Sequence, residues 1–296
     1  LHQADARGAE ATARRIQDAL NLPVQLDELG ITVTASIGIA MYPADGTTTN
    51  DLIKNADAAM YRVKERGRAG FRFYQPQMNV DLLARMKIDH AMRQALPAGH
   101  FRLAFQPQVD IRTQAVVAAE ALLRWRDPDL GDVSPAQFIP VAEESGFIVP
   151  LGEWVLSEAV RQAAVWQEEG CALQVSVNVS ALQFQQANFV ERVAAVLEAA
   201  GLAPELLELE LTETILIQDA EEALTRLRQL KRLGVRLAID DFGTGYSSLG
   251  YLKRVPIGKL KIDRSFISGL PADESDAGIV RAIISMARAL HLQVIA

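Results

Sequence analysis

From residue 101 onward, apolar and polar residues alternate between the periods of strands and of helices. Short apolar runs predict strands at 103–109, 116–123, 173–179, 207–212, 235–240, 258–263 and 292–296. Between most of them, apolar residues recur at helical spacing at 135–147, 151–168, 183–200, 219–233 and 275–290. Because strands that alternate with helices run parallel, we expect an α/β fold. About seven strands suit a (β/α) TIM-like barrel, cut short near its seventh strand, better than the alternative of an open sheet.

Two helix starts in this region carry capping signals. Ser134 and Gln137 form a capping box with Pro135 at the first helical position. Asp219, with Glu222 three residues later, predicts a second one.

Residues 1–75 predict a separate, smaller α+β unit. We expect a helix at 5–20, one strand at 31–39 and a helix from Asn50 or Asp51 to residue 66, ended by Gly67, before a closing strand at 71–74. These strands are too few to cover the helices, so the unit reads as the back half of a larger domain. We place the junction at 75–77, followed by a helix at 80–96, and expect domains at 1–75 and 76–296.

Polar residues lie inside or at the ends of five predicted strands. In 174–180 and 207–211 one face is apolar and the other polar, and 259–263 repeats the scheme. Asp240 and Asp241 end another strand, where Asp240 continues the face of Ala238 and Asp241 that of Ile239. If the apolar faces pack on helices, one set of side chains converges on the barrel lumen: Glu120, Asn178, Glu210, Asp240 and Lys261.

A single carboxylate in a strand more often lies at an edge or in a salt bridge, and we expect such a pair between Glu208 and Lys259. Several buried carboxylates without a cation are costly. Glu, Asn and Asp oxygens suit Mg²⁺, Mn²⁺ or Ca²⁺ rather than Zn²⁺, and no His stands at a strand end. Asp240 and Asp241 could bridge two ions for phosphate-ester hydrolysis, with Lys261 offsetting phosphate charge. The alternative is a barrel whose carboxylates form only internal salt bridges.

Composition narrows the function classes. The chain has 296 residues, 49% hydrophobic and 23% charged, which is typical of a globular protein. A net charge of −7 argues against DNA or RNA polymers as partners. A single cysteine, Cys171, fits a reducing compartment, and no apolar run approaches the roughly 18 to 20 residues of a membrane span. We expect a cytoplasmic protein, or the cytoplasmic portion of a larger protein.

From about residue 80 the chain resembles the EAL-domain phosphodiesterases that hydrolyse cyclic di-GMP. The matching stretches are FQPQVD (105–110), EAL (120–122), NVS (178–180), ELTE (210–213), DDFGTGYSSL (240–249) and KIDRSFI (261–267). Phe105 stands where the family more often has Tyr, and Ala119 where it often has Gly.

The resemblance implies hydrolysis to linear pGpG with Mg²⁺ or Mn²⁺, in the form of two ions. It implies that the metals are held by Glu120, Asn178, Glu210, Asp240 and Asp241. It also implies that Glu120, Asp240 and Lys261 are the catalytic residues, with Lys261 beside the attacking water. Gln106 and Arg124 would contact the dinucleotide, and Glu213 would steady the loop 242–249. A non-catalytic cyclic di-GMP receptor is the alternative, although such proteins are expected to lose ligands that are intact here. A homodimer is a further expectation.

Residues 1–75 resemble the C-terminal half of a GGDEF domain, the diguanylate cyclase fold. The matches are ASIGIA (35–40), NADAAMY (55–61) and KERGR (64–68). The signature segment is missing, so we expect no cyclase activity, and we expect Lys64 and Arg68 to be solvated residues at a helix end. Both chain ends look cut, and the chain stops one residue before a Glu that family members use.

Overall fold

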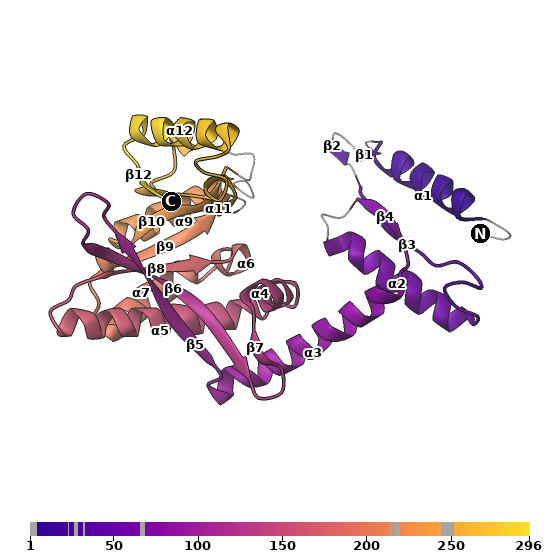
Figure 1. Cartoon of the computed structure of the whole chain (residues 1–296), viewed down its shortest axis with the longest axis horizontal. Coiled ribbons are helices and arrows are strands. Elements are labelled where there is room, and N and C mark those ends of the chain that lie inside the picture. The colour runs from indigo at the N-terminus through magenta and orange to yellow at the C-terminus, as the bar shows by residue number, and fades with distance from the viewer. Residues whose placement is uncertain are drawn as a thin grey trace. The chain divides into compact units, whose positions relative to one another are not determined.

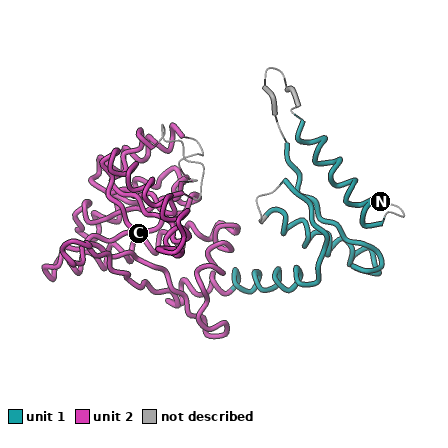
Figure 2. The backbone as a smooth tube through the Cα atoms, turned by 45° about the horizontal axis from the view of Figure 1, so that its top comes forward, with its two compact units in different colours: residues 1–90 teal, residues 91–296 magenta. Residues whose placement is uncertain are grey.

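The computed structural model describes residues 5–22, 24–26, 29–31, 33–65, 69–213, 215, 220–243 and 252–296. They form two compact units, residues 1–90 and 91–296, coloured separately in Figure 2. The predicted junction at 75–77 lies at the start of helix α3 (Pro76–Ala98), which runs past residue 90. The domain boundary at 75/76 stays a prediction.

Unit 1 contains helices α1 (Ala6–Leu20) and α2 (Thr49–Glu65) and two small sheets. Strands β1 (Val24–Leu26) and β2 (Leu29–Ile31) pair antiparallel, and β3 (Ser36–Ile39) and β4 (Gly70–Phe73) pair parallel. The prediction of one strand over 31–39 was wrong, because residues 33–35 pair with nothing while the chain passes from one sheet to the other.

The start of α2 also differs from the prediction. The hydroxyl of Thr48, not a side chain of Asn50 or Asp51, accepts the backbone N–H of Asp51 at 3.2 Å. The Thr48 hydroxyl in turn donates to Asp51 Oδ2 at 2.7 Å, so the two side chains satisfy one another at the helix start. Lys64 is exposed in the last turn, as expected, whereas Arg68 and Gly67 lie outside the described residues.

Unit 2 is built on one curled sheet with the strand order β12-β11-β10-β9-β8-β6-β5, and β7 pairs with β6 (Figure 1). The strands are β5 (Phe101–Val109), β6 (Val116–Asp127), β7 (Gly131–Val133), β8 (Gln174–Val179), β9 (Leu207–Thr212), β10 (Arg236–Phe242), β11 (Lys259–Ile262) and β12 (Gln293–Ile295). The strands from β6 through β8 to β12 are parallel, as predicted. The strand β5 is an exception. It runs antiparallel to β6, because only residues 110–115 separate the two strands.

Most helices of unit 2 lie where they were predicted, but several are shorter than the predicted ranges. They are α4 (Pro135–Glu144), α5 (Ile148–Glu168), α6 (Ala181–Phe184), α7 (Phe189–Ala200), the 3₁₀ turn η1 (Pro204–Leu206), α9 (Ala220–Arg232), α11 (Arg264–Ile267) and α12 (Glu274–Ala289). The single helix predicted over 183–200 is therefore two helices. The capping box at Ser134 is confirmed, and Asp219 lies outside the described residues. Across the described parts of the chain, no helix is long and apolar enough to cross a bilayer.

The core of unit 2 lies between the apolar face of the sheet and its covering helices. Val175, Leu209 and Ile239 are fully buried there against residues such as Ala159 and Leu227. Phe105, one of the departures from the family pattern, is accommodated with its ring centroid 4.9 Å from that of Trp166. Since side chains alternate along a strand, this packing turns the polar residues to the opposite face of the sheet.

Candidate active site

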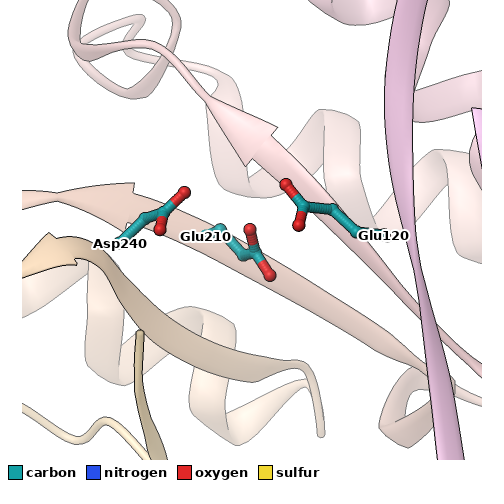
Figure 3. Close-up of side chains that lie close together, drawn as sticks. All are labelled: Glu120, Glu210 and Asp240. Carbon is teal, nitrogen blue, oxygen red and sulfur yellow. The ribbon is translucent and has the colours of Figure 1, made fainter. Parts of the chain in front are cut away.

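Three carboxylates from three strands meet on the polar face of the sheet. Glu120 comes from β6, Glu210 from β9 and Asp240 from β10, and Figure 3 shows them directed toward one another. One oxygen of each lies within 4.8 Å of the others. The predicted convergence of these residues is confirmed.

Lys261 from β11 lies among the three carboxylates. Its Nζ is 3.0 Å from Glu120 Oε2 and 3.1 Å from Asp240 Oδ2, and it also pairs with Glu210 Oε2. One ammonium therefore faces three carboxyl groups. Burial by itself lowers the pKa of Lys261, but the attraction of Glu210, Asp240 and Glu120 outweighs it and raises that pKa above its ordinary value.

Glu210 shows most directly that this cluster is short of positive charge. It is 1% exposed, and burial, with smaller contributions from Glu120 and Asp240, raises its pKa to about 8 although Lys261 opposes the shift. Its Oε1 is buried and has no hydrogen-bond partner among the residues that the structure describes. A hard divalent cation would satisfy that oxygen and favour the ionised form of all three carboxyls. The residues present therefore fit a metal of this class.

Asn178, from β8, borders the cluster. Its Nδ2 donates to Glu120 Oε1 at 2.8 Å, which fixes one carboxylate oxygen and leaves the carbonyl Oδ1 of Asn178 as an acceptor. This arrangement suits the ligand role predicted for Asn178, which stays a prediction.

Asp241 does not follow the face of Leu237 and Ile239, so the expected alternation was wrong at this residue. Its φ is +53°, and the register of β10 against β11 shifts between Ile239 and Phe242. The bulge adds one unpaired residue, so Asp241 is exposed while Ile239 is buried. Within the described part of the chain, the group of three carboxylates does not include Asp241.

The carboxyl of Asp241 lies instead beside Asp263, which sequence reasoning did not single out. Burial, the charge of Asp240 and a hydrogen bond with Asp263 raise the pKa of Asp241 to about 6. Hydrogen bonds from the side chain and backbone of Ser265 lower the pKa of Asp263. A signal for Asp263 existed, because it directly follows β11 at the same end of the sheet where Asp240 lies, two residues before the end of β10.

Glu213 contacts the segment that it is predicted to steady. It is 4% exposed, and its Oε1 accepts the backbone N–H of Gly243 at 2.7 Å. Gly243 has a φ of +105°, and a Cβ there would lie 2.8 Å from the ring of Phe266, so this position suits only glycine. Residues 244–249 of the predicted loop lie outside the described residues.

The two predicted substrate contacts lie on the antiparallel hairpin of β5 and β6. Gln106 is directly opposite Glu120 in the strand register, and Arg124 lies four residues beyond Glu120 on the same face. Arg124 Nη1 donates to the carbonyl of Leu123 at 2.9 Å. The roles of Gln106 and Arg124 stay predictions.

A second ionic cluster lies one layer lower on the same face of β8, β9 and β11. Lys259 Nζ is 2.6 Å from Glu208 Oε1, which also accepts from Ser176 at 2.9 Å, and all three residues are buried. The predicted Glu208–Lys259 pair is confirmed. In this lower cluster one carboxylate pairs with one ammonium. In the upper cluster, formed by Glu120, Glu210, Asp240 and Lys261, three carboxylates share one ammonium, so only the upper cluster needs a further cation to balance its charge.

Comparison with known proteins agrees with this geometry. Residues 89–296 match the family model "EAL domain", and residues 1–70 match "Diguanylate cyclase, GGDEF domain". The chain is 45% identical over 289 residues to the bifunctional diguanylate cyclase/cyclic di-GMP phosphodiesterase MucR of Pseudomonas aeruginosa, covering 97% of this chain and 42% of MucR. It is 40% identical over 287 residues to the cyclic di-GMP phosphodiesterase PdeR of Escherichia coli, covering 97% of this chain and 43% of PdeR. The chain thus spans less than half the length of these two relatives.

Among solved structures, the PaMucR phosphodiesterase in its c-di-GMP complex matches with a TM-score of 0.68 and 46% identity. That match covers 70% of this chain and 85% of the other. A cGMP-bound form of the EAL enzyme Bd1971 matches with a TM-score of 0.69 and 31% identity, over 83% of this chain and 64% of the other. The chain belongs to the EAL-domain family, and its EAL domain is preceded by a segment that matches the GGDEF domain.

Proposed function

We propose that the protein hydrolyses cyclic di-GMP to linear pGpG. The observation that carries the proposal is the upper cluster, in which Glu120, Glu210 and Asp240 share the single ammonium of Lys261. Relatives that are named cyclic di-GMP phosphodiesterases support it, as does the similar structure with c-di-GMP bound. One water adds across one 3′–5′ phosphodiester bond, and the ring opens.

The cation class follows from the ligands. Carboxylate and amide oxygens favour Mg²⁺ or Mn²⁺. When bound, such an ion would supply Lewis-acid chemistry for a phosphoryl oxygen and would lower the pKa of a bound water. Glu120, Glu210 and Asp240 would hold it together with Asn178 Oδ1, and Asp241 would hold a second ion with Asp240.

The remaining residues position and stabilise the substrate. Lys261, which pairs with all three carboxylates, would orient the attacking water and offset negative charge on the phosphate. Gln106 and Arg124 would contact the dinucleotide along the hairpin. Glu213, through its contact with Gly243, would keep the following loop in place over the site.

Wider properties belong to the same proposal. We place the protein in the cytoplasm, as a whole or as the cytoplasmic part of a larger protein, and expect a homodimer with no DNA or RNA polymer as partner. Light scattering that reports only a monomer at micromolar concentration would refute the dimer.

The test is an assay of the protein at its full natural length with cyclic di-GMP and Mn²⁺, with pGpG followed by chromatography. We expect product from the wild type and none from Glu120→Ala, because that change removes one of the three clustered carboxylates. Glu198→Ala, at an exposed site on α7, is the control that should keep full activity. Binding without product would support a receptor instead, and turnover by Glu120→Ala at the wild-type rate would refute the site.

A further inference from the structure

The face of the β5–β6 hairpin that carries Glu120 is organised in three tiers. Because side chains alternate, every second residue shares this face, and the strand register pairs them directly. Gln106 is opposite Glu120, Ala104 is opposite Leu122, and Arg102 is opposite Arg124. Moving away from the carboxylate cluster, the face is therefore polar, then apolar, then cationic.

The cationic tier is unusual because two arginines stand directly opposite one another. Side chains at such positions have Cβ atoms only about 4.5–5.5 Å apart, and like charges there destabilise a sheet. Among the described residues, no carboxylate pairs with either arginine: Arg124 donates to the Leu123 carbonyl, and Arg102 is exposed without a side-chain partner. The pair thus lacks the anion that would stabilise it.

The spacing of the tiers fits a ligand with two anionic groups. Arg102 and Arg124 lie four residues from the Gln106–Glu120 tier, about 13 Å along the strands at ~3.3 Å per residue. Long, flexible arginine side chains can shorten that distance by bending toward the cluster. The small Ala104 and the apolar Leu122 between the two tiers leave a face on which a ribose or base can lie. A cyclic dinucleotide has this sequence of features, since it has two phosphates separated by nucleosides.

We propose that Arg102 joins the opposite Arg124, whose contact with the dinucleotide is already part of the proposed function, in a subsite that binds the phosphate that is not being cleaved. This proposal rests on the proposed function and extends it to a residue that neither the motifs nor the clustered carboxylates single out. Two planar guanidinium groups on opposite strands can bind one phosphate from both sides with paired N–H···O hydrogen bonds. The subsite would select diesters that carry a second phosphate at this distance.

The experiment compares two substrates that differ in the second phosphate. In Arg102→Ala, we expect KM for cyclic di-GMP to rise about tenfold or more with little change in kcat, because a charge-assisted contact to the bound substrate is lost. For bis(p-nitrophenyl) phosphate, which has a single phosphate, kcat/KM should not change. Arg102→Lys, which keeps the charge but not the planar fork, should recover part of the loss.

Arg112→Ala is the matched control, since Arg112 is exposed at the turn of the same hairpin. It should behave as the wild type with both substrates. An unchanged KM for cyclic di-GMP in Arg102→Ala, or an equal loss with both substrates, would overturn the subsite. If the wild type cleaves neither diester, the proposed function fails separately. Calorimetric binding of cyclic di-GMP to wild type and Arg102→Ala then still decides the subsite: weaker binding by the variant supports it and equal binding refutes it.

Discussion

Glu208 and Glu210 lie two residues apart on one face of β9, yet their surroundings give them different chemistry. Among the described residues, Glu208 is the one carboxylate that pairs with Lys259, whereas Glu210 shares Lys261 with two other carboxylates. The residue type and the spacing are the same in both cases. The number of competing anions is what makes one position a closed salt bridge and the other a candidate ligand.

The raised pKa of Glu210 predicts how the metal-free protein responds to pH. Because the carboxyl titrates near 8 in the folded state and near 4.5 when unfolded, the folded state holds a proton that the unfolded state has lost. Stability should therefore fall as pH rises from about 5 to about 8, by an amount on the order of a few kcal/mol. Asp241, whose pKa is raised to about 6, contributes to the loss of stability in the lower part of this pH range. The lowered pKa of Asp263 has the opposite effect on stability, and only at pH values below this range.

Urea unfolding in EDTA at several pH values measures this slope. Glu210→Gln should flatten it, while Glu208→Gln, the matched change one layer lower, should keep it. Mn²⁺ should bind more tightly as pH rises, because binding displaces the proton. If stability depended on pH as strongly in Glu210→Gln as in the wild type, Glu210 would not be the source of the pH dependence.

At the scale of elements, the sequence predicted the positions of most helices and strands of unit 2. It failed where the structure depends on which strand pairs with which. Strand and helix periods located β8, β9 and β10 within about two residues. Periodicity could not show that β5 would turn antiparallel, nor that residues 33–35 would leave both sheets, because each depends on which strand lies alongside. The convergence of Glu120, Glu210 and Asp240 was predictable from alternation, whereas the bulge at Asp241 was not, since no local signal marks a left-handed aspartate.

The same substitution, glycine to alanine, should change stability in opposite directions at two positions of unit 2. Gly243→Ala should destabilise unit 2 by about 1–3 kcal/mol, because alanine is strained at a φ of +105° and its Cβ would meet Phe266. Gly278→Ala, in the exposed middle of α12 where an added Cβ meets nothing within 4 Å, should instead stabilise by up to about 1 kcal/mol.

Chemical denaturation of both variants, with the wild type beside them, measures these changes. Equal effects at the two glycines would contradict the proposed strain. Adding Phe266→Leu to Gly243→Ala should restore only the part that is due to the clash.

At the scale of the molecule, the two units differ sharply in their cores. Among the described residues of unit 1, the buried apolar side chains are mainly alanines, such as Ala9, Ala13, Ala58 and Ala59, with Val63 and Met78. Unit 2 buries large side chains including Trp125, Phe138 and Leu151. Since apolar burial is the main favourable contribution to folding, unit 2 should be the more stable of the two.

The positions of the tryptophans make this difference measurable. All three, Trp125, Trp154 and Trp166, belong to unit 2, so their fluorescence follows that unit alone, while far-ultraviolet circular dichroism follows both. In a urea titration, the dichroism signal should begin to fall at a lower concentration than the fluorescence changes. Coincident curves would show one cooperative transition and contradict the prediction.

The buried Glu208–Lys259 pair has a further consequence for the proposed metal site. An electrically balanced layer joins β9 to β11 beneath the acidic one, so the strands are tied together whether or not an ion is present. If the acidic layer binds the proposed cation, such a scaffold can release the ion and bind another without refolding. Chelation should act as a reversible off switch rather than as a denaturant.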